Sequence, residues 1–158
     1  MRTQIACLAL LACLGACATS QRAAPTGGSV ILPVEAAATL YRQCSRASPP
    51  PAEGWWRPEA EDLARFEAAL PEATAGSPEG RALDLARFAT EYRRQYVGTV
   101  RGGRRFIYGN FYQANLEFPN SDWRREPAMI CDGGPSFFGA EYDVESGTIT
   151  HLAFNGRI

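Results

Sequence analysis

The spacing of apolar residues changes near residue 91, and this change constrains the fold more than any other feature of the chain. Before it, apolar residues recur at helical spacing between Pro58 and Pro71, where a helix is expected to begin and end. After it, β-branched and aromatic runs alternate with turn sequences, which is typical of short strands. The helical set is Leu63, Phe66 and Leu70, and the strand runs are EYRRQYVGTV, RRFIYGNFYQA, PAMIC, FFGAEYDV and TITHLAF.

A second helix is expected to follow the first, with Ser77 as its N-cap and Pro78 in its first turn. RGGR and DVESGT are expected to form hairpin turns between strands, and DGGPS a loop. Short links between successive strands favour an antiparallel meander. The sequence therefore predicts a single α+β domain over residues 33–158, with two helices packed on one face of a meander of about five strands. The second helix is expected to direct Leu83, Leu85, Phe88 and Tyr92 toward the core.

Composition limits the function classes. The chain has 158 residues, of which 46% are hydrophobic, so it can form one packed domain. Its formal net charge of −1 opposes a role that depends on attraction to nucleic acid. All 16 basic residues are arginine, so chemistry that needs a lysine amine is excluded.

The chain starts like a secretory signal peptide. Arg2 is followed by the run IACLALLACL at residues 5–14, which carries no charge. As a helix this run would be about 15 Å long, roughly half the thickness of the hydrocarbon core of a bilayer. It is therefore too short to span a membrane and suits the apolar region of a signal peptide.

LGAC, which ends at Cys17, resembles the lipobox of bacterial lipoproteins. The resemblance implies cleavage after residue 16, a diacylglycerol on the Cys17 thiol and a further acyl chain on its freed amine. Ala18 then favours the outer membrane, facing the periplasm, because aspartate at that position commonly marks retention in the inner membrane. LLAC, ending at Cys13, fits less well because Leu11 is bulky, and an ordinary cleaved signal peptide is the other alternative. Residues 17–32, rich in small and polar side chains, are expected to form a flexible tether.

Two cysteines remain after the signal peptide and the lipidated residue are set aside. Because the cell envelope is oxidising, Cys44 and Cys131 are expected to form a disulfide. The alternative is a catalytic cysteine paired with His151, although no neighbouring sequence feature marks either thiol as activated.

Basic and aromatic residues alternate on the first two long strands. If the basic and aromatic faces of the two strands lie on the same side of the sheet, the sheet presents a surface suited to an anionic glycan, a lipid headgroup or an acidic protein. The alternative is that the tyrosines are core residues and that the arginines are solvated or paired with acidic helices. The candidate binding face is Tyr92, Arg94, Tyr96, Arg104, Phe106, Tyr108 and Tyr112.

Three carboxylates are candidates for catalysis. Glu141 and Asp143 stand two residues apart on one strand, about 7 Å apart along it, which suits paired acid–base chemistry. Asp143 and Asp132 also fit a simpler role, because aspartate often caps its own turn. A cation site at these carboxylates is a further alternative, but the sequence has no EF-hand spacing and no Cys/His cluster for zinc, and no metal or cofactor is predicted.

The C-terminal half resembles an uncharacterised family of bacterial envelope proteins. The similarity covers residues 91–156 and rests on YRRQYVGTV, RRFIYGNFY, CDGG, FFGAEYD and LAFNG. It implies one intact domain and no particular activity. The sequence therefore predicts a lipid-anchored envelope protein with a non-catalytic binding or structural role, and the alternative is a cell-envelope hydrolase that uses Glu141, Asp143 and Asp132.

Overall fold

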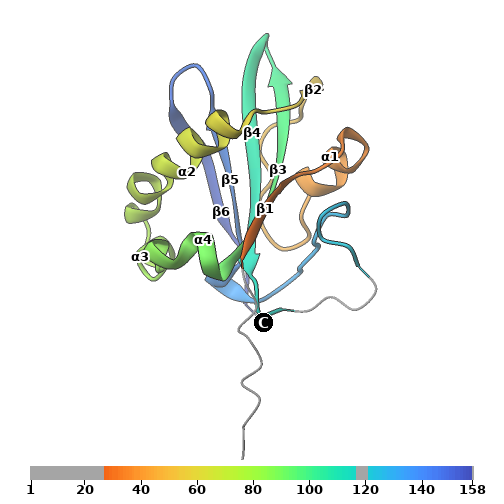
Figure 1. The fold of residues 1–158 in the computed structure, drawn as a ribbon. Coiled ribbons are helices and arrows are strands. Elements are labelled where there is room, and N and C mark those ends of the chain that lie inside the picture. The colour runs from red at the N-terminus through yellow and green to blue at the C-terminus, as the bar shows by residue number, and fades with distance from the viewer. Residues whose placement is uncertain (1–26, 117–120, 158) are drawn as a thin grey trace, which may run out of the picture.

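In the computed structural model, which describes residues 27–116 and 121–157, these residues form a six-stranded mixed sheet (Figure 1). The strand order is β1-β3-β4-β5-β6, and β2 shares the outer edge of β3 with β1. Strands β1 and β3 are parallel and the other pairs are antiparallel. The α+β class is therefore confirmed, whereas the pure antiparallel meander is wrong. The strands are β1 (Gly28–Ile31), β2 (Gly54–Trp56), β3 (Tyr92–Arg101), β4 (Arg104–Gln113), β5 (Phe138–Asp143) and β6 (Thr148–Phe154).

Helices cover both faces of the sheet rather than one. Figure 1 shows α2 and α3 on one side and α1 on the other. Helices α2 and α4 pack on the first face around Phe66 and Phe111, whereas α1 packs on the second face around Tyr41 and Tyr108. Each face therefore has its own apolar core. The helices in the described residues are α1 (Val34–Tyr41), α2 (Ala60–Ala75), α3 (Pro78–Arg81) and α4 (Phe88–Glu91).

The second predicted helix is broken into short pieces. Ser77 is the N-cap as predicted, since its hydroxyl accepts a hydrogen bond from the Gly80 amide at 2.9 Å. The helix then ends after one turn at Arg81, and a 3₁₀ turn (Leu85–Arg87) leads into α4. Gly80 lies against the Thr74 backbone, so the chain folds back on the end of α2 instead of continuing as one helix.

The end of the predicted tether belongs to the sheet. Residues 28–31 form β1, and the Leu32 amide continues the pairing by donating to the Tyr96 carbonyl at 2.9 Å. Gly27 lies so close to the backbone of residues 89–92 that a Cβ atom there would clash. The tether prediction is therefore wrong for its last residues, and the rest of it lies outside the described residues.

The predicted strand PAMIC is not a strand in the structure. Buried side-chain amides replace strand pairing there: Asn110 donates to the Ala128 carbonyl at 3.0 Å, and the Ala128 amide donates to Gln95 Oε1 at 2.9 Å. Both side chains lie on the sheet face that α1 covers, so they attach the segment to that face without extending the sheet.

Helix α2 begins with a capping box. The Glu59 amide donates to Asp62 Oδ2 at 2.9 Å, and Arg65 donates to the other Asp62 oxygen at 2.6 Å. Pro71 was expected to end this helix, but it lies inside it, and α2 continues to Ala75. Proline removes one helical hydrogen bond without ending the helix here, because buried Leu70 and Thr74 hold the last turn against the rest of the fold.

Replacing Asp62 with alanine is expected to destabilise the domain by about 1 kcal/mol at neutral pH, because the cap loses its acceptor. Burial alone would raise the pKa of Asp62, but the hydrogen bonds from Glu59 and Arg65 lower it below its ordinary value. A carboxylate with a lowered folded pKa stabilises above its unfolded pKa and loses that contribution as pH falls through the folded pKa. Urea unfolding measured from neutral to acidic pH should therefore show that Asp62→Ala loses less free energy of unfolding on acidification than the wild type does. Glu61→Gln is the control, because it changes an exposed carboxylate, and its pH dependence should match that of the wild type.

Candidate ligand-binding site

The two halves of the predicted binding face lie on opposite sides of the sheet. The two-residue turn at Gly102 and Gly103, both with positive φ, pairs Arg101 with Arg104. Along this hairpin an even-numbered residue of β3 therefore faces an odd-numbered residue of β4, and Arg94 lies opposite Phe111. The prediction placed even-numbered residues of both strands on one face, and that assignment is wrong.

The β3 half lies under the helices of the first face. Tyr92 and Tyr96 are buried, and Tyr96 donates its hydroxyl hydrogen to Glu67 of α2. Arg94 contacts both oxygens of the same carboxylate at 2.7 Å. Burial, the Glu67 charge and the hydrogen bond to it raise the pKa of Tyr96 above its ordinary value. These residues hold α2 on the sheet and present no aromatic surface to solvent.

The β4 half is buried on the second face. Phe106, Tyr108 and Tyr112 are each at most 5% exposed. Tyr108 accepts hydrogen bonds from Arg46 at 3.2 and 3.3 Å, and burial raises the pKa of Tyr112 to about 12. Arg104 is half-exposed and forms ion pairs with Asp143 and Glu145. These residues therefore follow the alternative to a binding face. The tyrosines are core residues, and Arg104 is paired with acidic residues of β5 and of the turn after it.

Glu141 is held by an internal ion pair. It is 1% exposed on the second face of β5, and both of its oxygens accept hydrogen bonds from Arg101, at 2.8 and 3.2 Å. The Tyr41 hydroxyl contacts Glu141 at 2.8 Å and Thr150 contacts it at 3.2 Å. Burial, followed by the hydrogen bond to Glu141, raises the pKa of Tyr41 above its ordinary value. A buried carboxylate with this many partners is held in place by the fold and is poorly placed to act on a substrate.

Asp143 and Asp132 have structural roles. Asp143 is buried, pairs with Arg104 and accepts hydrogen bonds from the amides of Glu145 and Ser146 at 2.9 and 3.3 Å, as predicted for a turn cap. The backbone carbonyl of Asp132 accepts a hydrogen bond from the Asn155 side chain at 3.1 Å. Within residues 27–116 and 121–157, no group of three or more His, Cys, Asp or Glu side chains is placed to hold a metal ion.

The structure bonds Cys44 to Cys131, with Cα atoms 5.0 Å apart across 87 residues of sequence. His151 lies elsewhere, with Nε2 3.0 Å from the Ala47 carbonyl. The predicted disulfide is therefore confirmed, and neither thiol is free to form the alternative catalytic pair with His151.

A nearly buried arginine joins the disulfide-linked segments to the sheet. Arg46 follows Cys44 closely and donates to Asn110 on β4 and to Asn155 after β6, the latter at 2.8 Å. Its acceptors in the described residues are neutral oxygens rather than carboxylates. Asn155 in turn donates to the Ile130 carbonyl at 2.6 Å, so this network spans both sides of the disulfide.

The surface around Trp55 is concave. The two tryptophans of β2 point to opposite sheet faces because successive strand residues alternate. Trp56 donates its indole hydrogen to the carbonyls of Thr99 and Phe106, whereas the Trp55 indole has no hydrogen-bond partner in the part of the chain that the structure describes. The Trp55 ring meets Tyr41 edge-on at 6.1 Å.

Trp55 lines two pockets. The first, the β1–β2 pocket, has a volume of about 380 Å³ and lies where β1 and β2 share the edge of β3. The second, the α1 pocket, has a volume of about 390 Å³ and lies between α1 and the proline-rich loop. The β1–β2 pocket is lined by Ile31, Leu32, Val34, Ala37, Trp55, Trp56, Arg57, Val97 and Gly98, and the α1 pocket by Ala38, Tyr41, Arg42, Ser48, Pro49, Pro51, Ala52 and Trp55.

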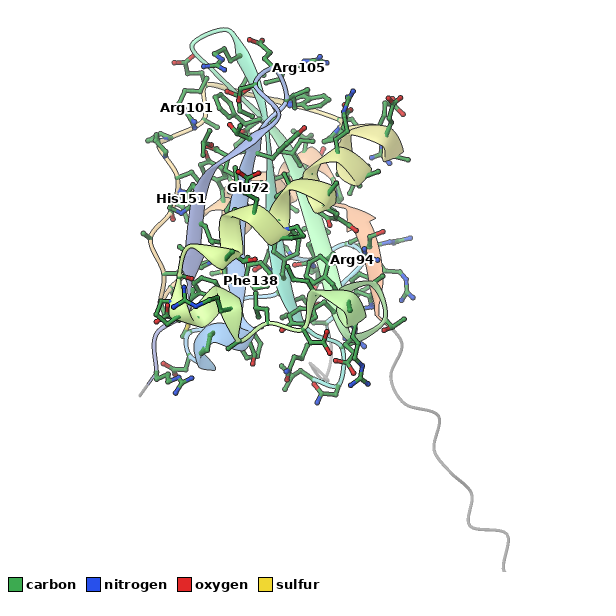
Figure 2. All side chains as sticks on the ribbon, turned by 90° about the vertical axis from the view of Figure 1, so that its left-hand side faces the viewer. Glu72, Arg94, Arg101, Arg105, Phe138 and His151 are labelled. Atoms are coloured by element: carbon green, nitrogen blue, oxygen red, sulfur yellow. A yellow bond between two sulfur atoms is a disulfide. The ribbon has the colours of Figure 1, made fainter. Side chains whose placement is uncertain are left out.

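Both pockets are mainly apolar, with one arginine each. Arg57 and Arg42 are exposed and form no ion pair with any residue of 27–116 or 121–157. Figure 2 shows Arg101 and Arg105 near the hairpin end of the sheet, away from Arg94, so the basic residues do not form one patch. Arg57 and Arg42, neither of which has an ion-pair partner in the described residues, each line one of the pockets beside Trp55.

The prediction from sequence did not include Trp55, Trp56 or Arg57. A signal was present in GWWRP, where two adjacent tryptophans and an arginine follow the loop SPPPAEG. A short strand there would direct one tryptophan to each face. The pockets themselves are lined from several segments that only the tertiary structure brings together.

Comparisons with known proteins return no match: no family model matches the chain, and neither do the curated proteins nor the solved structures compared with it. The resemblance of residues 91–156 to an envelope family therefore stays a prediction. Cys17 and the rest of the lipobox lie outside the described residues. Of the helices within the described residues, none is long and apolar enough to cross a membrane.

Proposed function

We propose that the protein is a lipid-anchored bacterial envelope protein whose folded domain binds an apolar ligand without catalysing a reaction. The lipobox LGAC after a short apolar run supports lipidation of Cys17, and Ala18 supports transfer to the outer membrane, facing the periplasm. The Cys44–Cys131 disulfide is consistent with an oxidising compartment.

The observation that carries the binding role is the pair of apolar pockets beside Trp55, each with an exposed, unpaired arginine among its lining residues in the described part of the chain. Ligand sites are typically concave and apolar with a few polar groups that orient the ligand. The hydrolase alternative lacks comparable support, because Glu141 and Asp143 are buried and committed to arginines and a turn.

The anchor is tested by replacing Cys17 with serine in cells. We expect the protein to leave the membrane fraction and to lose incorporation of labelled palmitate, because serine provides no thiol for the diacylglycerol. Cys13→Ser is the matched control, since it alters the other candidate lipobox and should leave both properties unchanged. Retention of the Cys17→Ser protein in membranes, or loss of labelling with Cys13→Ser, would contradict the assignment.

A further inference from the structure

We propose that the β1–β2 pocket binds the alkyl chain of a single-chain anionic amphiphile, with its headgroup on Arg57. This inference rests on the proposed function, because it names the ligand class for that binding role. Among the residues that line the pocket, Leu32, Ala37 and Val97 are at most 3% exposed. Covering this mainly apolar lining with an alkyl chain removes apolar surface from water, which is favourable.

The rim of the pocket is also apolar. Val34, the first residue of α1, is 54% exposed, the highest value for a large hydrophobic residue in the described chain, where Met129 follows at 41%. It lines the pocket together with Trp55. An exposed apolar rim beside a hollow marks an interaction site rather than scattered surface hydrophobicity.

Arg57 supplies the charge complementarity. It is the charged residue among those that line the pocket, it is exposed, and it has no ion-pair partner in the described residues. The arginines of the hairpin differ, because Arg101 and Arg104 are paired with carboxylates of β5. A free guanidinium at the mouth of an apolar pocket matches a ligand with one anionic group, which it can bind by two parallel hydrogen bonds.

Other ligand classes fit this pocket less well. A sugar needs several hydrogen-bonding partners, but the Trp56 indole hydrogen is already donated to Thr99 and Phe106. An extended peptide would need a free edge on β3 beside the pocket. That edge is occupied, because β1 pairs with it on one side of Val97 and β2 pairs with it on the other.

The proposed anchor would bring the pocket close to amphiphiles of the membrane. Ten residues separate Cys17 from Gly28, and ten residues can span at most about 36 Å. The pocket begins at Ile31, the end of β1. A domain held at this distance would meet single-chain lipids released from the adjacent leaflet.

The test uses the full chain carrying Cys17→Ser, so that its own lipid cannot fill the pocket. The probes are dodecyl phosphate and dodecanoate, below their micelle concentrations, with neutral dodecyl maltoside for comparison, and binding is measured by titration calorimetry. We expect both anionic probes to bind with one site per chain. Arg57→Gln should weaken them about fivefold while leaving dodecyl maltoside unchanged, because only the headgroup contact is lost.

Two further variants locate the site. Val34→Asp, at the exposed rim, should weaken the binding of all three probes because it places a charge beside their alkyl chains. Arg125→Gln removes the same charge as Arg57→Gln at a position with one long ion pair of 3.9 Å, and it should leave every affinity unchanged. Thermal unfolding of each variant checks that the fold is intact.

The results separate the two proposals. Absence of binding by both anionic probes, while Cys17→Ser still releases the protein from membranes, would overturn the amphiphile site and leave the anchor standing. A larger loss with Arg42→Gln than with Arg57→Gln would also overturn it, because the headgroup would then lie at the α1 pocket. Equal losses with Arg57→Gln and Arg125→Gln would indicate a general charge effect and overturn the site as well.

Discussion

Replacing Glu141 with glutamine is expected to lower the free energy of unfolding by about 3 kcal/mol, the lower end of the range for breaking a buried ion pair. Glutamine keeps the shape of the side chain and still accepts the Tyr41 hydrogen bond, but it leaves Arg101 without its counter-charge. The Arg101 side chain is 23% exposed, so partial solvation of its guanidinium keeps the loss from being larger. Urea unfolding at neutral pH measures the change.

The reverse variant should cost more. Arg101→Met leaves the Glu141 carboxylate, 1% exposed, without its cation, and we expect a loss of about 4 kcal/mol. The double variant Glu141→Leu with Arg101→Met should recover most of this loss, because apolar side chains of similar volume avoid the desolvation of two charges. Glu145→Gln is the control, since its carboxylate is 55% exposed and surface pairs contribute about 0–1 kcal/mol. A Glu141→Gln loss no larger than that of Glu145→Gln would contradict the assigned role.

For Glu141, the sequence could predict the side of the strand on which the carboxylate lies but not the ion pair with Arg101. Glu141 and Asp143 were expected on one face of one strand, and both do lie on the second face of β5. Strand alternation is local and can be predicted from spacing. Whether a carboxylate is free for chemistry depends on residues remote in sequence, here Arg101 and Tyr41, the second of which is 100 residues away.

The error in the binding face has a different cause. The RGGR turn and both long strands were predicted correctly, and a two-residue turn determines which residues face each other. Because Arg101 pairs with Arg104, each even-numbered residue of β3 pairs with an odd-numbered residue of β4. Arg94 and Tyr108 therefore cannot share a face. The information was present in the length of the turn, and it places the two aromatic sets in separate cores.

Short edge strands were beyond prediction for a physical reason. Strand β1 has four residues and β2 has three, too few to show a period, and each depends on the long β3 for its hydrogen bonds. The β1–β2 pocket exists because these two strands approach the same edge. A site formed in this way depends on tertiary pairing, which no single segment of the sequence specifies.

Removing the disulfide is expected to have the largest effect. The double variant Cys44→Ser with Cys131→Ser opens a link across 87 residues, and the chain-entropy model gives about 4–5 kcal/mol for a loop of that size. The loss should not be complete, because Arg46 and Asn155 still connect the two segments to the sheet. The urea midpoint of the double variant should therefore lie well below that of the oxidised wild type and match that of the reduced wild type.

The redox dependence provides the control for this prediction. A reductant should lower the midpoint of the wild type and leave the double variant unchanged, because the variant has no bond between these positions to reduce. Carrying Cys17→Ser in both proteins removes the proposed lipidation site, so the comparison reports on the folded domain alone. An unchanged wild-type midpoint after complete reduction, with both thiols detected by mass, would mean that the buried Arg46 network, rather than the disulfide, holds residues 42–46 against residues 128–132.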